Sequence, residues 1–192
     1  MSINDLLTEI KITPITDIIF DFDETLATLH IDWSRWGEEM ASIIQRYESG
    51  PYNIFSHHAL NELTRKHGLE FRREMIENNG PAEQRNCSGY TKHEPILRLL
   101  RQASEQSRVH LWTSNNRETV QPLLEELEID NLFTRKVFYN DVTYIKPDPD
   151  GFTLINTDGI TAEQFMFVGD SASDAGACSA AGIRFVHVDE VA

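Results

Sequence analysis

Hydrophobic and polar positions change their spacing along the chain, and these changes predict alternating strands and helices. Short apolar runs that end in polar residues predict buried strands, and apolar residues three and four positions apart predict helices. The expected strands are "TDIIFDFD" (16–23), "RVHLWTSNN" (108–116), "KVFYND" (136–141), "QFMFVGDSASD" (164–174) and "RFVHV" (184–188). Because helical segments separate these strands, we expect an α/β fold with a parallel sheet covered on both faces.

A group of helical patterns stands between the first and second expected strands, with Gly or Pro near the helix ends and no convincing strand among them. These patterns span residues 32–49, 55–68 and 71–80. Further helices are expected at 2–10, 94–106, 117–129 and 173–182, and after the turn in "KPDPDGF". We therefore expect one core, formed by residues 1–29 and 90–192, and an inserted helical segment formed by residues 30–89.

Length and charge narrow the class of protein. A chain of 192 residues suits one core with a modest insertion. The net charge of −14 argues against nucleic-acid and anionic-membrane partners, although a small phosphorylated substrate needs only local positive charge. No apolar run approaches the length of a membrane span, and the acidic N-terminus does not resemble a signal peptide. Cys87 and Cys178 are expected to be free thiols in a reducing compartment, which predicts a cytoplasmic location.

Polar side chains follow four of the expected strands, where an open α/β sheet binds its ligands. The candidates are Asp21 and Asp23, then Thr113, Ser114 and Asn115, then Lys146 in the loop after the third strand, then Asp170 and Asp174. Clustered carboxylates suit Mg²⁺, and a lysine can pair with a phosphate. This combination predicts phosphoryl transfer, in which catalysis depends on positioning and charge neutralisation.

In this order the segments resemble the four motifs of the haloacid dehalogenase superfamily, in its phosphoglycolate phosphatase-like branch. The motif residues lie in "DFDETL", "LWTSNN", "KPDPDGF" and "GDSASD", and the resemblance runs from about residue 16 to residue 188. It implies a Rossmann-like, doubly wound core and makes the inserted segment a small α-helical cap. It also implies a Mg²⁺-dependent phosphatase that forms an aspartyl-phosphate from a small phosphorylated metabolite.

The resemblance also implies residue roles. Asp21 is the nucleophile, and Asp23 is the general acid and then the base. Thr113 binds a phosphoryl oxygen, although neighbouring Ser114 is an alternative in the same motif. Lys146 steadies the charge on Asp21 and on the phosphate. The expected metal ligands are Asp21, the backbone carbonyl of Asp23, and Asp170, with Asp174 either joining or supporting them or capping the helix that follows.

Other interpretations stay open at this stage. A phosphomutase would use the same residues, and a receiver domain of a signalling protein also combines acids, a hydroxyl residue and a lysine. Glu24 stands where the family commonly has glycine, and strand alternation predicts that its side chain turns away from the site. Several cap residues could reach the site, although a surface position or helix packing is the simpler interpretation for most of them: His57, His58, Trp33, Trp36, Arg46, Arg65, Lys66, Arg72 and Arg73.

Overall fold

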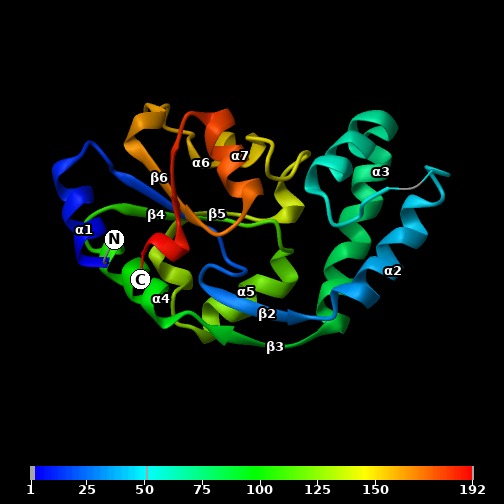
Figure 1. Cartoon of the computed structure of the whole chain (residues 1–192), viewed down its shortest axis with the longest axis horizontal. Coiled ribbons are helices and arrows are strands. Elements are labelled where there is room, and N and C mark those ends of the chain that lie inside the picture. Colours follow the sequence, from blue (N-terminus) through cyan, green and yellow to red (C-terminus); the bar gives the residue numbers. More distant parts are fainter. Residues whose placement is uncertain (1–2, 51, 192) are drawn as a thin grey trace.

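The protein is represented by a computed structural model that describes residues 3–50 and 52–191. A five-stranded parallel sheet in the order β5-β4-β1-β6-β7 forms its centre (Figure 1). The strands are β1 (Asp17–Phe20), β4 (Arg108–Trp112), β5 (Phe133–Val137), β6 (Phe165–Gly169) and β7 (Arg184–His187). The parallel, doubly wound α/β fold expected from the sequence is confirmed.

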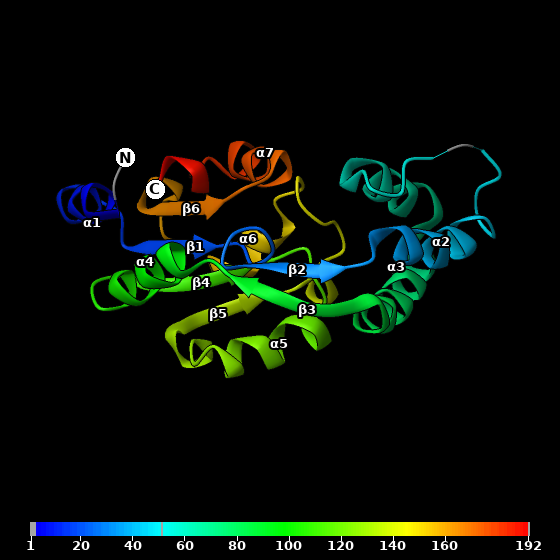
Figure 2. The ribbon, with the colours of Figure 1, turned by 60° about the horizontal axis from the view of Figure 1, so that its bottom comes forward.

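Helices cover both faces of this sheet, and Figure 2 shows α5 and α7 on opposite sides of it. The helices of the core are α1 (Ile3–Ile12), α4 (Glu94–Ser104), α5 (Arg117–Glu126), α6 (Asp150–Ile155) and α7 (Ala172–Ala181). Short 3-10 helices are η1 (Asp130–Leu132), η2 (Tyr139–Asp141), η3 (Ala162–Gln164) and η4 (Val188–Glu190). Strand β1 is buried along its whole length, as a central strand covered on both faces must be, and this explains its continuous apolar run.

The register of the sheet brings the polar strand ends together. Phe20, the last residue of β1, pairs with Leu111 of β4 and with Val168 of β6. The chain segments that follow these three strands therefore leave the sheet at one edge. Asp21 begins such a segment, and its backbone N–H donates to the carbonyl of Val168 over 3.0 Å.

The inserted cap lies beside the core and contains α2 (Trp33–Ile44) and α3 (His57–Asn86) (Figure 1). The two helices expected at 55–68 and 71–80 are present as the two parts of α3, which meet at a kink at Gly68, where the backbone is not helical and φ is 80°. Two strands that the sequence did not predict, β2 (Ala27–Ile31) and β3 (Cys87–Lys92), pair antiparallel and connect core and cap. Strand β2 buries alternate residues, β3 is mostly exposed, and their pairing carries a register shift, so they lack the continuous buried apolar run of the core strands.

The strand expected at 136–141 is displaced toward the N-terminus. Strand β5 ends at Val137, and the backbone turns into η2 because the carboxylate of Asp141 accepts a hydrogen bond from the N–H of Phe138 over 2.9 Å. Cys87 and Cys178 are free thiols, as expected. Among the described residues, no helix combines the length and apolar character that crossing a membrane would require.

Candidate active site

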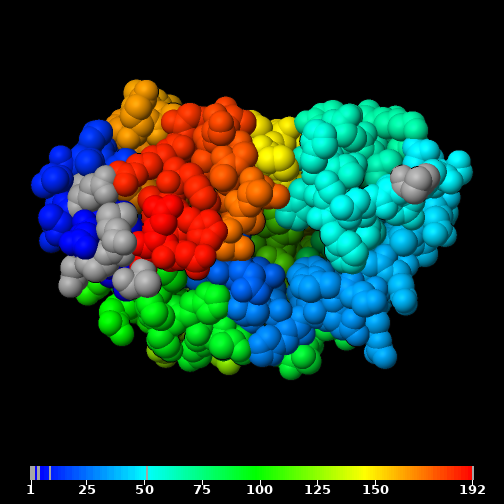
Figure 3. Space-filling model, viewed as in Figure 1, coloured from blue at the N-terminus to red at the C-terminus, as the bar shows by residue number. Residues whose placement is uncertain are grey.

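A cleft of about 320 Å³ lies between the sheet edge and the cap, and Figure 3 shows the molecule hollowed between these two parts. Core residues Asp21, Asp23, Ser114, Asn115, Lys146 and Asp170 line one side of it. Residues of α2 and α3 and of the loop that joins these helices line the other side. The structure thus gathers most of the residues expected from the sequence in one place, beneath the cap.

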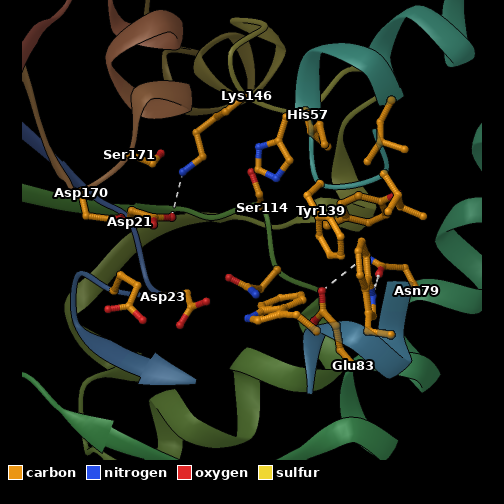
Figure 4. A pocket seen from close by; sticks show the side chains of 18 residues that line it. Asp21, Asp23, His57, Asn79, Glu83, Ser114, Tyr139, Lys146, Asp170 and Ser171 are labelled. Carbon is orange, nitrogen blue, oxygen red and sulfur yellow. Dashed lines mark hydrogen bonds and ion pairs between the residues drawn. The ribbon is translucent and has the colours of Figure 1, made fainter. Parts of the chain in front are cut away.

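Lys146 is the cation at the centre of the site. Only 3% of its side chain is exposed, and its Nζ donates to Oδ1 of Asp21 over 2.8 Å and to the carbonyl of Trp112 over 3.0 Å. The same Nζ lies 2.5 Å from Oδ1 of Asp174. Burial opposes the charge on Lys146, but the two carboxylates outweigh it and raise its pKa. Lys146 therefore stays charged and connects its own motif to Asp21 of the first motif and Asp174 of the fourth. Figure 4 shows its contact with Asp21.

Three carboxylates gather around this ammonium. One oxygen from each of Asp21, Asp170 and Asp174 lies within 4.8 Å of the others. The side chain of Asp23 is not in this group. Three negative charges with one lysine leave an excess that a divalent cation would neutralise, and carboxylate oxygens are the ligands that Mg²⁺ prefers. The residues present therefore fit Mg²⁺.

Asp174 has a second, structural task at the start of α7. Its Oδ2 accepts hydrogen bonds from the N–H and the hydroxyl of Ser171 over 3.0 and 2.7 Å, and Ser171 Oγ accepts from the N–H of Asp174. This reciprocal pair is a capping box. Asp174 therefore combines helix capping with a place in the acidic cluster, which the sequence allowed for one residue.

The acids of the site differ in their tendency to ionise. Burial raises the pKa of Asp21, Asp174 and Asp170 add to the rise, and Lys146 opposes it. Burial would also raise the pKa of Asp174, but Lys146 and Ser171 outweigh it and lower the value. For Asp23, burial raises the pKa to about 7, although the N–H of Leu29 donates to its carboxylate over 2.7 Å. Asp23 can therefore exchange a proton near neutral pH.

The second motif differs in detail from the sequence expectation. Thr113 is buried, and its hydroxyl donates to Oδ1 of Asn115 over 2.9 Å while accepting from the Asn115 N–H over 3.1 Å. Thr113 does not line the cleft, whereas Ser114 and Asn115 do. The buried Oγ of Ser114 has no hydrogen-bond partner among the described residues. The structure therefore places Ser114, and not Thr113, in the lining of the cleft, with its Oγ buried and unpaired.

Glu24 also lies elsewhere than expected. It lines the cleft instead of turning away, and its φ is 57°. A left-handed backbone interrupts strand alternation, and it also favours glycine, which is the common residue of the family at this position. Thr28 donates to the Glu24 carboxylate over 3.1 Å. The strand pattern failed here because the chain turns directly after β1.

Several cleft residues were not predicted as site residues. His57 begins α3 and lies beside Ser114 in Figure 4, although the sequence favoured a helix-surface position. Glu83 of α3 is buried in the wall of the cleft, and its carboxylate accepts from the backbone N–H of Asn116 over 3.1 Å. Tyr139 joins the wall from η2. The clustered histidines gave a weak signal for His57, whereas nothing in the sequence around Glu83 or Tyr139 separates them from packing residues.

Comparison with known proteins agrees with this geometry. The family model of haloacid dehalogenase-like hydrolases matches residues 18–188. A phosphoglycolate phosphatase of Pseudomonas putida is 35% identical over 91 residues, which are 47% of this chain and 33% of that protein. The chain thus matches about a third of the length of this curated relative.

Two solved structures have the same fold. A putative haloacid dehalogenase-like hydrolase from Bacteroides fragilis has a TM-score of 0.58 at 26% identity, and the match covers 89% of this chain and 86% of that one. A haloacid dehalogenase family enzyme of Bacteroides thetaiotaomicron, in complex with magnesium and inorganic phosphate, has a TM-score of 0.55 at 19% identity, with coverage of 90% and 93%. Because the family model covers most of the chain, and the sheet edge carries the four motifs, the chain belongs to the haloacid dehalogenase-like hydrolase family.

Proposed function

We propose that the protein is a Mg²⁺-dependent phosphatase that hydrolyses a small phosphate monoester through an aspartyl-phosphate on Asp21. One observation carries the proposal. A buried ammonium holds a carboxylate at the end of the central strand, and two further carboxylates lie within 4.8 Å of it. This arrangement can hold a cation and a phosphoryl group beside a fixed nucleophile. The curated phosphatase relative supports the same reaction class.

In the first step, an oxygen of Asp21 attacks phosphorus, and the bond between phosphorus and the alcohol oxygen breaks. Lys146 holds the attacking carboxylate in place and neutralises charge on the phosphoryl group. Ser114 lines the cleft, and its buried Oγ has no hydrogen-bond partner among the described residues, so a turn of this side chain would let its hydroxyl donate to a phosphoryl oxygen. Asp23 gives its proton to the departing alcohol oxygen, and its pKa of about 7 allows it to carry that proton.

In the second step, water attacks the phosphorus of the aspartyl-phosphate. Asp23, now ionised, takes a proton from that water, and the bond between phosphorus and the Asp21 oxygen breaks to release inorganic phosphate. One residue thus serves as acid and then as base. The cap, residues 30–89 on β2 and β3, would exclude bulk water during this sequence.

Asp21, Asp170 and the backbone carbonyl of Asp23 would hold Mg²⁺. Asp174 would support them from behind, because Lys146 and Ser171 already engage its two oxygens. When bound, the ion supplies neutralisation of charge on the transferring phosphoryl group. The Bacteroides thetaiotaomicron structure, which holds magnesium and phosphate, supports this assignment through its shared fold.

The test separates the two aspartates of the first motif. Asp23→Asn keeps the backbone carbonyl and the side-chain shape but loses proton transfer, a contribution of roughly a hundredfold to ten-thousandfold. An activated aryl phosphate needs the acid less than an alkyl phosphate does. With the aryl ester, Asp23→Asn should therefore give a rapid burst of phenol, followed by slow turnover as the aspartyl-phosphate accumulates. Inorganic phosphate measured in parallel separates hydrolysis from transfer.

Asp21→Asn is the control, because it removes the nucleophile and should show neither burst nor turnover. Equal losses of the phosphoryl-transfer rate for both esters in Asp23→Asn, with no burst, would show that Asp23 is not the acid and base.

A further inference from the structure

The cleft wall that faces the catalytic aspartates is mainly apolar. It is lined by Trp33, Trp36, Ile54, Phe55, Leu60, Tyr139 and Ile145. The rings of Trp33 and Trp36 pack edge to face with their centroids 5.3 Å apart, and the ring centroids of Trp36 and Phe55 are 6.0 Å apart. Although they line a cleft, Trp33 is 37% exposed and Phe55 is 59% exposed. Exposed aromatic side chains gathered in a cleft indicate a surface that an apolar ligand covers.

This wall has no counter-charge for an anion. Among the described residues that line the cleft, Lys146 is the one lysine or arginine, and Asp21 and Asp174 already hold its ammonium. His57 also lines the cleft, but burial and the nearby Lys146 charge lower its pKa to about 4, so it is neutral at physiological pH. The phosphate of a substrate would share Lys146, and a second negative group would find no cation.

The basic residues of the cap are all engaged elsewhere. Arg72 is buried behind Tyr139, where its guanidinium donates to the carbonyls of Val142 and Tyr139. The others pair with carboxylates away from the cleft: Arg35 with Asp32, Arg46 with Glu74, Arg65 with Glu62 and Asp148, Lys66 with Glu48, Arg73 with Glu77, and Arg85 with Glu39. Among the described residues of the cap, no lysine or arginine therefore reaches the cleft.

The polar groups of the wall would repel an anion or are already used. Trp36 Nε1 donates to Oδ1 of Asn79 over 2.6 Å, and Nδ2 of Asn79 donates to Glu83 over 3.3 Å. Glu83 and, at the other side of the cleft, Glu24 bring carboxyl groups to it. Burial raises the pKa of Glu83 to about 7, so Glu83 offers an anion no counter-charge in either protonation state. A carboxylate on the substrate would therefore be desolvated beside aromatic rings and the Glu24 side chain without a cation to pair with, which is strongly unfavourable.

We propose that the natural substrate is a phosphate monoester whose alcohol part is apolar and carries no negative charge. This inference rests on the phosphatase function proposed above. It separates this chain from the phosphoglycolate phosphatase that it matches in part, because the leaving group of phosphoglycolate is a small carboxylic acid. The aromatic wall would cover the alcohol part while the phosphate lies at Asp21 and Lys146.

The test compares kcat/KM for a small set of esters in the presence of Mg²⁺. The set contains 3,3-dimethylbutyl phosphate as the apolar ester, glycerol 1-phosphate as an uncharged polar ester, and 3-phosphooxypropanoate and phosphoglycolate as acids. Uncompensated charge beside like charge costs enough to predict that the apolar ester exceeds both acids by at least about a hundredfold. It should also exceed the glycerol ester by roughly tenfold, since the apolar wall covers only the former.

A variant adds the missing charge. Trp33→Arg places a guanidinium at an exposed position of the wall and should raise the ratio of acid to apolar ester by roughly tenfold. Ser34→Arg is the matched control, because it adds the same charge at the neighbouring, exposed position of α2, outside the cleft. That control should leave the ratio unchanged.

The outcomes separate the two proposals. If the wild-type protein hydrolyses either acid as well as the apolar ester, or if Ser34→Arg changes the ratio as much as Trp33→Arg, the substrate class is wrong while the phosphatase function stands. If Mg²⁺ supports hydrolysis of none of the esters, nor of an activated aryl phosphate, the phosphatase function itself is wrong and the substrate class falls with it.

Discussion

Strand β1 begins with a buried aspartate and is followed directly by a second one, and the two residues differ in what surrounds their carboxylates. Asp17 at its start is 1% exposed, and Asp21 directly after its end is 7% exposed. Both lie beside cations from later parts of the chain. They therefore allow a comparison between a carboxylate that is held for stability and one that is held for chemistry.

Asp17 is saturated with donors. Thr16 Oγ1 lies 2.7 Å from its Oδ2, Arg108 Nη2 lies 3.0 Å from the same oxygen, and His110 Nε2 lies 2.8 Å from its Oδ1. Arg108 Nε also lies 2.9 Å from Oδ1. Burial opposes the charge, but the hydrogen bonds from Arg108, Thr16 and His110 outweigh it and lower the pKa of Asp17. This carboxylate is ionised and has no remaining capacity for a ligand.

Asp21 has fewer partners and more like charges. Lys146 donates to one of its oxygens over 2.8 Å, while the carboxylates of Asp170 and Asp174 lie close by. The outcome is a raised pKa instead of a lowered one. Burial opposes the charge at both carboxylates; at Asp21 burial and the neighbouring acids outweigh Lys146, whereas at Asp17 the donors outweigh burial. A buried carboxylate with few hydrogen-bond donors and several acids beside it indicates a binding site for a cation or another ligand.

The largest expected effect separates the two residues by activity. Asp21→Asn should lower turnover of an aryl phosphate by roughly ten-thousandfold or more, because the nucleophile is lost. Asp17→Asn should change kcat per folded molecule by less than about threefold, since it lies at the opposite end of the strand. Steady-state rates normalised to folded protein check this. A loss in Asp17→Asn that approaches that of Asp21→Asn would remove the distinction.

The second largest expected effect is the loss of activity when divalent cations are removed. Removing divalent cations with a chelator should abolish activity, and adding Mg²⁺ should restore it, because the carboxylates of Asp21, Asp170 and Asp174 otherwise repel one another. Calcium should inhibit, because its larger and looser coordination shell misplaces Asp21. Mg²⁺ should also raise the melting temperature of the wild-type protein and of Asp17→Asn, but hardly that of Asp170→Asn.

Calorimetric melts with and without Mg²⁺ measure this shift independently of activity. Full activity in chelator, or an equal shift in Asp170→Asn, would contradict the metal assignment.

The roles of Asp21 and Asp17 differ in how well the sequence alone could predict them. Asp21 was predictable because an apolar run ends in two acids and three further motifs follow in order. Asp17 could not be distinguished from a polar strand boundary, because its partners Arg108 and His110 lie on another strand and reach it only through parallel pairing. Local pattern identifies strand ends, but it does not show which strands become neighbours.

Three other differences have similar causes. Thr113 and Ser114 both carry hydroxyls, and their positions depend on where β4 ends, since the Thr113 N–H still pairs with the carbonyl of Val137. Strands β2 and β3 were missed because β2 buries only alternate residues and β3 is mostly exposed, so neither carries a continuous apolar run. The cleft wall could not be predicted because Trp33, Phe55 and Glu83 come from separate parts of the cap and meet only after folding.

The smallest expected effect is on stability and its dependence on pH. Removing one partner from a fully buried ion pair costs about 3 to 5 kcal/mol. Because Arg108 is 41% exposed, Asp17→Asn should lower the free energy of unfolding at pH 7 by less, about 2 kcal/mol. Because folding lowers the pKa of Asp17, its stabilisation is present above the unfolded pKa of about 3.9 and is lost as pH falls through the folded value. The gap between wild type and variant should therefore narrow below about pH 4. Urea unfolding at pH 7, 5, 4 and 3 measures that gap.

Asp158→Asn is the matched control, because Asp158 binds the same Arg108 over 2.7 Å but is 51% exposed. Exposed pairs contribute little, so this control should change stability by less than about 1 kcal/mol. A gap for Asp17→Asn that stays constant down to pH 3 would mean that Asp17 stabilises the sheet through packing and not through its charge.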